Sequence, residues 1–177
     1  EMERAATAAD VPTMVCFSYR FYAPFRFAKW IISNGFIGDV LNVYIQHLKS
    51  SAFIENRPLE WRFQKALAGS GVLGDLGAHM LDTARFLAGE ITAVCAQTSI
   101  AVRNRKKIDS EEMAQVNTDD ACDVLAKIEN DALASISVSR CAVGNDNNAK
   151  VVIYGNKGMI GIDSNRLGVV EVCSGKL

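Results

Sequence analysis

Apolar and polar residues alternate along much of the second half of the chain, and this pattern predicts a run of short β-strands. The stretches are residues 91–101, 121–129, 132–141, 150–154, 159–163 and 168–173. Tight turns are predicted at Asn130-Asp131 and at residues 155–158, where Asn, Asp and Gly supply the backbone conformations that a turn needs. Residues 104–119 are polar and charged, so we expect an irregular connection there.

The first half of the chain contains two further predicted strands. Residues 13–20 are rich in Val, Phe and Tyr and predict a strand that ends before Pro24. Residues 39–49 predict the other strand. Side chains two positions apart lie on the same side of a strand, so one face of it carries Leu41, Val43, Ile45 and His47.

Apolar residues recur every three or four positions in two other segments, which predicts amphipathic helices. The first helix is predicted to begin at Pro24 and to end at Asn34-Gly35. Its apolar residues are Phe25, Ala28, Ile31 and Ile32. The second helix is predicted over residues 75–88, with an apolar stripe of Leu73, Leu76, Met80, Ala84 and Leu87.

Helices come early in this order and hairpin-connected strands come late. That order predicts an α+β fold, with an open, mostly antiparallel β-sheet and helices packed on one face. Residues 132–139 illustrate the two faces of such a sheet. One side carries Leu133, Ser135, Ser137 and Ser139, and the other carries Ala132, Ala134, Ile136 and Val138.

Charge and composition exclude several classes of function. The chain has 177 residues, with 19 Lys and Arg against 20 Asp and Glu, so no net field attracts nucleic acid or an anionic membrane. The basic cluster at residues 103–107 is short and lacks interleaved aromatics, which is typical of a solvated loop. No stretch approaches the roughly 18 apolar residues of a membrane span. Five dispersed cysteines without a C-x-x-C pair indicate reduced thiols, and therefore a cytoplasmic protein.

The glycines at 69, 71 and 74 have the G-x-G-x-x-G spacing of a dinucleotide-binding loop. That motif needs a buried strand before it, whereas the preceding residues 55–65 are charged and contain Pro58. We therefore interpret these glycines as a turn that lets the following helix approach a cleft closely, which residues without Cβ allow.

The predicted helix 75–88 has a second, polar stripe that includes Asp75, His79 and Asp82. A carboxylate one turn before an imidazole can fix its tautomer and prepare it to take a proton from an alcohol. The residues alone leave two alternatives open. His79 could donate to a backbone carbonyl while Asp75 caps the helix, or Asp75 and His79 could bind a metal together with His47.

Several motifs, in order along the chain, resemble the Gfo/Idh/MocA oxidoreductases. They are "YRFYAP", "NGFIGDV", "EWRF", "GSGVLGDLGAHMLD", "FLAG", "NTDDACDVLAKIENDALASISVS" and "VIYGNKGMIGID". The D-x-x-x-H helix preceded by glycines is the most specific of them. The resemblance implies a parent in which an N-terminal Rossmann domain binds NAD or NADP and is followed by the fold predicted above.

The resemblance also implies boundaries and roles. Residues 1–20 would be the end of the Rossmann domain, and residues 21–177 a substrate-binding and oligomerisation domain that is truncated at its C-terminus. The chain would serve an NAD(P)-dependent oxidoreductase acting on a secondary alcohol or ketone of a sugar or cyclitol. A non-catalytic binding or structural domain on the same fold is the alternative, and a metal-dependent hydrolase is a further one.

The residue roles carried by the resemblance are few. His79 and Asp75 match the catalytic positions, Arg20 matches a substrate-side arginine, and Trp61 and Arg62 fall near the pocket rim. The glycines that bind the cofactor would lie outside this chain, so we expect no nucleotide to bind it alone and no metal. The open sheet face would be covered by a second subunit, giving a homodimer.

Overall fold

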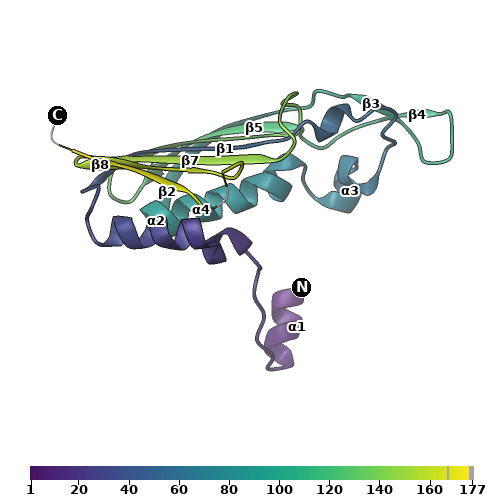
Figure 1. Cartoon of the computed structure of the whole chain (residues 1–177). Helices are drawn as coiled ribbons and strands as arrows, with labels where there is room; N and C mark the ends of the chain where they lie inside the picture. Colours follow the sequence, from purple (N-terminus) through teal and green to yellow (C-terminus); the bar gives the residue numbers. More distant parts are fainter. Residues whose placement is uncertain (167, 176–177) are drawn as a thin grey trace.

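The computed structural model describes residues 1–166 and 168–175, and within them it shows a seven-stranded sheet with helices on one face (Figure 1). The strand order is β2-β5-β6-β1-β7-β8-β9. The strands are Val40–Leu48 (β1), Ile91–Ser99 (β2), Ala121–Ile128 (β5), Leu133–Ser139 (β6), Asn148–Gly155 (β7), Gly158–Asp163 (β8) and Val170–Ser174 (β9). Neighbours pair antiparallel except β1 and β6, which are parallel. The predicted α+β fold is confirmed.

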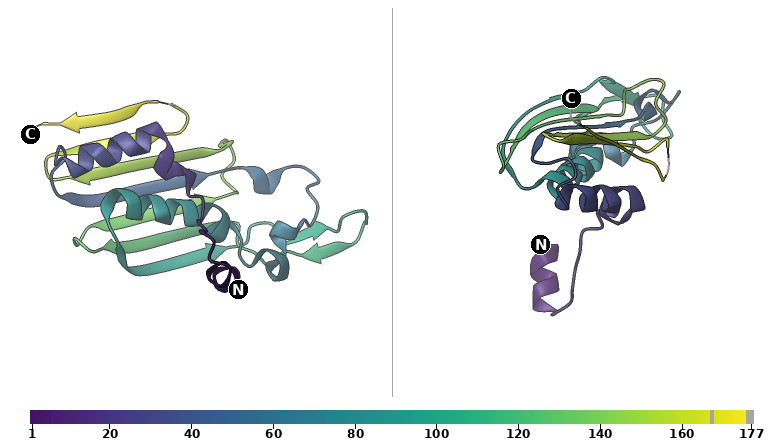
Figure 2. Two further views of the ribbon diagram at one scale, coloured as in Figure 1. Left: turned by 90° about the horizontal axis from the view of Figure 1, so that it is seen from below. Right: turned by 60° about the vertical axis from the view of Figure 1, so that its left-hand side comes forward.

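Two helices, α2 (Ala23–Ser33) and α4 (Ala78–Ala88), lie side by side under this sheet (Figure 2). Both were expected, although the turn before α4 is a π-helical one, Leu73–Gly77, and a short helix α3 (Lys65–Ala68) precedes it. A further helix, α1 (Met2–Ala8), stands away from the sheet on an extended segment (Figure 1). None of the described helices is both long and apolar enough to cross a membrane.

The core lies between the sheet and the two helices. Leu76, Met80, Ala84 and Leu87 of the predicted helical stripe are each no more than 4% exposed. On β6 the side chains of Ala134, Ile136 and Val138 are buried, as the alternation predicted. Burying each large aliphatic side chain stabilises the fold by about 1.5–3 kcal/mol. The apolar pattern therefore fixes which face of each element meets the other.

Strand β1 departs from the predicted alternation at one end. Val43, Ile45 and His47 face the core, but Leu41 is 49% exposed. The register with β7 shifts between Val40 and Asn42, which marks an irregularity in the pairing. The shift turns Val40 inward in place of Leu41, so the predicted face is wrong for this one residue.

The strand predicted over residues 13–20 is wrong. The segment is irregular and then forms a 3-10 turn, η1 (Ser18–Phe21). Within the described residues it pairs with no strand, and Met14 and Val15 are more than 70% exposed. β-rich composition without a partner strand does not make a strand, because a strand is stabilised by its cross-strand pairs.

The connection predicted over residues 104–119 holds a small hairpin of β3 (Asn104–Lys106) and β4 (Met113–Gln115). Lys106 and Lys107 are solvated and pair with Glu111 and Glu112, as expected for a basic loop. Arg105 is instead 5% exposed and points inward. The description of this cluster as a solvated loop is therefore wrong for its central arginine.

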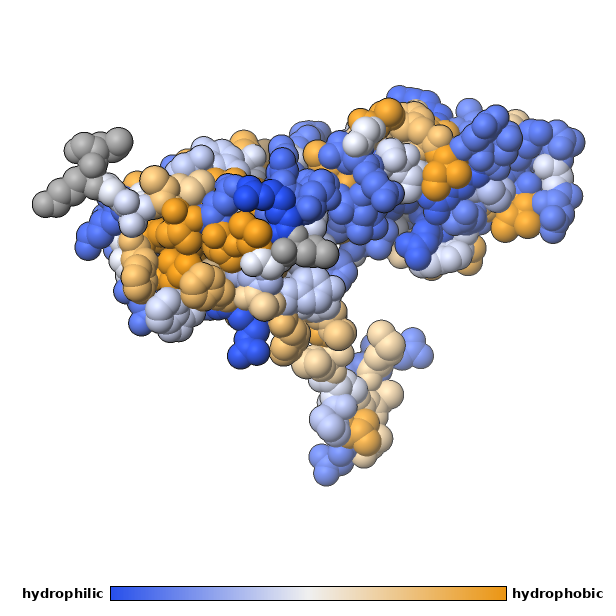
Figure 3. Space-filling model, viewed as in Figure 1, coloured by the Kyte–Doolittle hydropathy of each residue, from blue (hydrophilic) through white to orange (hydrophobic). Residues whose placement is uncertain are grey.

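The face of the sheet that carries no helix exposes several large apolar side chains. Tyr44, Leu125, Leu133 and Tyr154 are 44–65% exposed, and the rings of Tyr44 and Tyr154 lie 6.0 Å apart. Figure 3 shows apolar side chains gathered at a different place as well, where α2 meets the last strands. The sheet is thus packed on one side only.

Candidate functional site

The turn that leads into α4 is held by one carboxylate. Asp119 accepts hydrogen bonds from the backbone N–H groups of Gly71 (2.8 Å) and Leu73 (2.7 Å), and its own carbonyl accepts from Val72 (2.9 Å). A Cβ on Gly71 would lie 2.1 Å from the Asp119 carbonyl oxygen, so only glycine fits. These glycine-turn N–H groups are occupied by protein, and the turn therefore does not fit the pyrophosphate of a dinucleotide.

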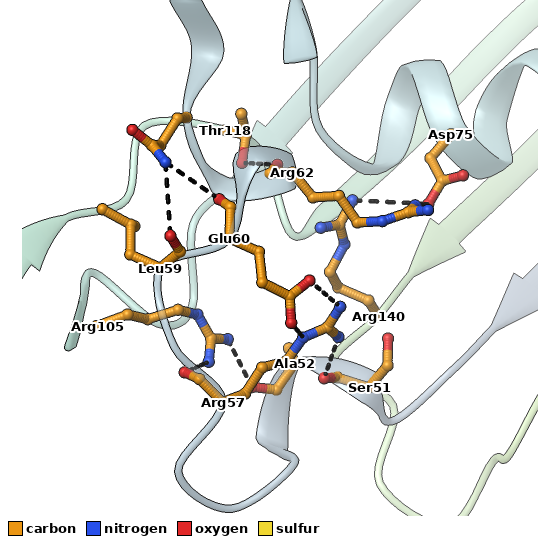
Figure 4. A network of polar contacts seen from close by, with 11 residues as sticks. Ser51, Ala52, Arg57, Leu59, Glu60, Arg62, Asp75, Arg105, Thr118 and Arg140 are labelled. Atoms are coloured by element: carbon orange, nitrogen blue, oxygen red, sulfur yellow. Dashed lines mark hydrogen bonds and ion pairs between the residues drawn. The ribbon is translucent and has the colours of Figure 1, made fainter. Parts of the chain in front are cut away.

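Asp75 lies in the π-helical turn and faces two arginines rather than His79. Its Oδ2 is 3.4 Å from Nη1 of Arg62 and 4.0 Å from Nη2 of Arg140 (Figure 4). No hydrogen bond joins Asp75 to His79 within the described part of the chain. The wider π-turn breaks the one-turn stacking that α-helical spacing predicts, and the guanidinium groups supply opposite charge.

His79 is half-buried beside two aromatic rings. Phe17 meets it edge-on at 5.7 Å between centroids, and Tyr19 lies at 5.9 Å. Its Nδ1 is buried and has no hydrogen-bond partner among the described residues, so the alternative in which His79 donates to a backbone carbonyl gains no support either. Burial against an edge-on ring holds the imidazole in place while leaving it free of a polar partner.

Arg20 forms an ion pair with Asp82, not with Asp75. Its Nε and Nη2 donate to the two oxygens of Asp82, at 2.8 and 2.6 Å, and this hydrogen bonding raises the pKa of the arginine. Asp82 is 5% exposed and belongs to α4, while Arg20 belongs to η1. The bidentate pair therefore fastens η1 to the helix that carries His79.

Trp61 and Arg62 lie together and both line a cavity. Both belong to the 3-10 turn Trp61–Phe63, and the Arg62 guanidinium stacks 4.7 Å from the Trp61 ring. With Asp75 and Arg140 they line a cavity of about 210 Å³. Three of the five predicted site residues are thus brought together, while His79 and Arg20 do not line this cavity.

His47 lies close to this region but is engaged elsewhere. Its Nε2 is 2.8 Å from Oδ1 of Asn147, and burial, opposed in part by that hydrogen bond, lowers the pKa of the imidazole. Among the described residues, no group of three or more His, Cys, Asp or Glu side chains is arranged to hold a metal ion. The arrangement of Asp75, His79 and His47 suggested by the sequence therefore gains no support from the geometry.

Arginines missed by the sequence reasoning surround Phe63. The guanidinium carbons of Arg105, Arg57 and Arg140 lie 4.1, 5.0 and 5.7 Å from its ring centroid. Arg57 pairs with Glu60 (Figure 4). Burial lowers the pKa of Arg105. Isolated arginines on separate segments gave no local pattern that could have predicted this cluster.

Comparison with known proteins places this geometry in a family. The family model described as "GFO/IDH/MocA C-terminal domain" matches residues 25–161. Levoglucosan dehydrogenase of Pseudarthrobacter phenanthrenivorans is 32% identical, over 97% of this chain and 47% of its own length. The chain thus spans about half the length of this curated relative.

Solved structures agree with the sequence comparison. A levoglucosan dehydrogenase in complex with NADH and L-sorbose superposes with a TM-score of 0.88 at 34% identity, over 93% of this chain and 43% of that one. An NAD binding oxidoreductase from Klebsiella pneumoniae gives a TM-score of 0.91 at 34% identity, over 98% and 46% of the two chains. The chain therefore belongs to the GFO/IDH/MocA family and contains its C-terminal domain.

Proposed function

We propose that this chain is the substrate-binding domain of an NAD(P)-dependent oxidoreductase that interconverts a secondary alcohol and a ketone of a sugar or cyclitol. The observation that carries the proposal is the meeting of Asp75, Trp61 and Arg62 at one cavity, next to the helix that bears His79. Converging polar groups beside an aromatic ring suit a polyhydroxylated ligand. The dehydrogenase relatives support the same reaction class.

In this proposal each site residue has a separate task. His79 removes or returns the hydroxyl proton, for which an imidazole without a competing hydrogen bond among the described residues is suited. Asp75 accepts and Arg62 donates hydrogen bonds to other hydroxyls, and Trp61 packs against the sugar ring. Arg20 acts as a positioning residue, because it holds η1 and its neighbour Tyr19 next to the imidazole.

The nicotinamide cofactor, NAD or NADP, would supply the hydride acceptor or donor. The glycine turn of this chain does not fit it, so we assign the nucleotide site to another domain of a longer parent. Residues 1–20 would belong to the end of that domain and residues 21–177 to the substrate domain, of which 167 and 176–177 lie outside the described residues. The separation of α1 from the sheet supports assigning the first residues to that domain, although Arg20 of η1 is paired with Asp82 of α4. The five free cysteines suit a cytoplasmic location.

We also propose that the open sheet face forms a homodimer. The exposed side chains of Tyr44, Leu125, Leu133 and Tyr154 make this face apolar, and one face meeting its own copy gives a closed two-fold contact. Leu125→Arg should convert the dimer to a monomer in light scattering, while Lys157→Glu, in an exposed turn, should not. A wild-type monomer at every concentration would contradict the dimer.

The catalytic assignment is tested by His79→Ala in the full-length parent. We expect kcat to fall by roughly 10²- to 10⁴-fold, the usual contribution of a positioned general base, with a much smaller change in KM. Asp75→Asn should weaken substrate binding and also lower kcat. Measuring the melting temperature of each variant separates catalysis from folding.

Two other outcomes would change the interpretation. A less stable His79→Ala enzyme with near-normal kcat would remove His79 from the mechanism. A parent that binds sugars but never turns them over, with any nicotinamide cofactor, would favour the non-catalytic binding domain instead.

A further inference from the structure

The parallel pairing of β1 and β6 places two cations side by side at the carboxyl ends of these strands. The last register pair is Leu48 with Ser139, so Lys49 and Arg140 follow as the next neighbours. The Lys49 N–H donates to the Ser139 carbonyl at 2.8 Å, which keeps the two chains adjacent beyond the strands. The pairing therefore brings together two cations that are far apart in the sequence.

Both cations open onto a cavity next to the proposed sugar site. Lys49, Arg62, Asp75 and Arg140 contribute to its wall, and its volume is about 440 Å³. Cavities of this size hold small molecules. Because Arg62, Asp75 and Arg140 also line the smaller cavity beside Trp61, the two spaces share a wall.

Arg140 is a buried cation without an adequate partner. The residue is 4% exposed, and its guanidinium makes no hydrogen bond within the described residues. Its nearest carboxylate oxygen, on Asp75, is 4.0 Å away and lies closer to Arg62, at 3.4 Å. Two guanidinium groups thus share one carboxylate. A guanidinium that lines a cavity and receives so little hydrogen bonding from the protein is available to bind a negative group.

The surrounding groups supply only part of that negative charge. Arg57 already forms an ion pair with Glu60. Arg105 donates hydrogen bonds to the backbone carbonyls of Ala52 and Arg57, at 2.6 and 3.2 Å. Lys49 makes no ion pair among the described residues. The other carboxylate on the cavity wall is Asp146, which is exposed. The buried carboxylate of Asp120 interacts electrostatically with Arg105 and does not line the cavity. The cavity wall therefore carries more positive than negative groups, namely Lys49, Arg57, Arg62 and Arg140 against Asp75 and Asp146.

We propose that this cavity binds an anionic group, a carboxylate or a phosphate, between Arg140 and Lys49, and that the substrate of the site is an anionic sugar. The planar fork of an arginine can bind two oxygens of such a group, and a lysine adds a mobile point charge. That the ligand is a sugar rests on the proposed function. The binding of an anion rests on the cavity alone.

Titration calorimetry of the 177-residue chain tests the proposal with glucose 6-phosphate, glucuronate and glucose. We expect one of the two anionic sugars to bind at least about tenfold more tightly than glucose, and its affinity to fall as salt is raised. The tighter of the two identifies the anionic group. Glucose binding as tightly as both anionic sugars would overturn this inference and leave the proposed function intact. If no sugar binds, the substrate site itself fails.

Substitutions of Arg140 and Lys49 test where the anionic group binds. Arg140→Met keeps the apolar part of the side chain and should weaken binding of the anionic sugar by about 10- to 100-fold, with little effect on the binding of glucose. Arg140→Lys should restore part of the loss. Because Arg140 also packs on Phe63, Lys49→Met provides a second test that leaves this packing intact, with an expected loss of about tenfold.

The matched control is Lys157→Met, which removes an exposed cation from the turn between β7 and β8 and should leave binding unchanged. Folded Arg140→Met and Lys49→Met chains that bind the anionic sugar as tightly as the unmodified chain would overturn the proposed location. Equal losses for the anionic sugar and for glucose would instead assign Arg140 a purely structural role.

Discussion

The core under the sheet and the annex around Phe63, formed by residues 51–63 and 104–118, are stabilised in different ways. The core is a continuous set of mostly aliphatic side chains from the sheet and from α2 and α4. The annex has only a small apolar cluster of Leu59, Phe63 and Val116, with Ala52 buried nearby in the chain. It compensates with arginines that lie over the Phe63 ring and donate to backbone carbonyls.

This difference explains where the site lies. Aliphatic packing is non-directional and can fix the position of a helix, but it leaves no polar groups for a ligand. Guanidinium groups, in contrast, make directional contacts with rings and carbonyl oxygens and remain charged. The proposed site lies at the junction of the two regions, where Asp75 comes from the helical side and Trp61 and Arg62 come from the annex.

The largest effect is expected in the core. Ile136→Ala removes a side chain that is 1% exposed on β6, and should lower the free energy of unfolding by about 2–5 kcal/mol, through lost burial and the cavity left behind. Chemical denaturation measures the change. Ser135→Ala, on the opposite face of the same strand, should change the free energy by less than about 0.5 kcal/mol. Equal losses in the two variants would contradict a one-sided core.

The turn that leads into α4, at the junction of the core and the annex, should be the next most sensitive to substitution. Asp119→Ala leaves the N–H groups of Gly71 and Leu73 without their acceptor, and should cost about 2–3 kcal/mol, because bonds to a charged group are among the stronger ones. Asp119→Asn keeps one acceptor oxygen and should cost less. In the parent, Asp119→Ala should also raise KM, since this turn positions Asp75. An unchanged KM in a folded variant would separate the turn from the site.

Periodicity was enough to predict most of the fold. Strands β5 and β6 and both long helices came from alternation or helical spacing, because one face of each element must meet a single core. Residues 13–20 failed because strand composition does not reveal whether a partner strand is present. The face predicted for Leu41 was wrong because nothing in the local sequence pattern indicates an irregular register between β1 and β7.

The site could be predicted only in part. The helix pattern and the family resemblance led to Asp75, and the resemblance led to Trp61 and Arg62, which the structure brings together. Arg140 and Lys49 were missed because their proximity depends on the parallel pairing of two strands that are far apart in the sequence. The π-helical turn was missed for a similar reason. It changes the direction of Asp75 without changing the composition of the helix.

Phe63→Leu should have the smallest effect of these substitutions, and it is the sharpest test of how the annex is stabilised. Leucine keeps an apolar side chain but removes the ring that lies 4.1 Å from the guanidinium of Arg105. We expect a loss of about 1–2 kcal/mol in the free energy of unfolding, part of it from the cation–π contacts. In an Arg105→Met background the same substitution should cost less, because the contact it removes is already absent. Phe25→Leu in the main core is the matched control and should cost the same in both backgrounds. If Phe63→Leu also costs the same in both, the ring only fills volume and the annex is stabilised like the core.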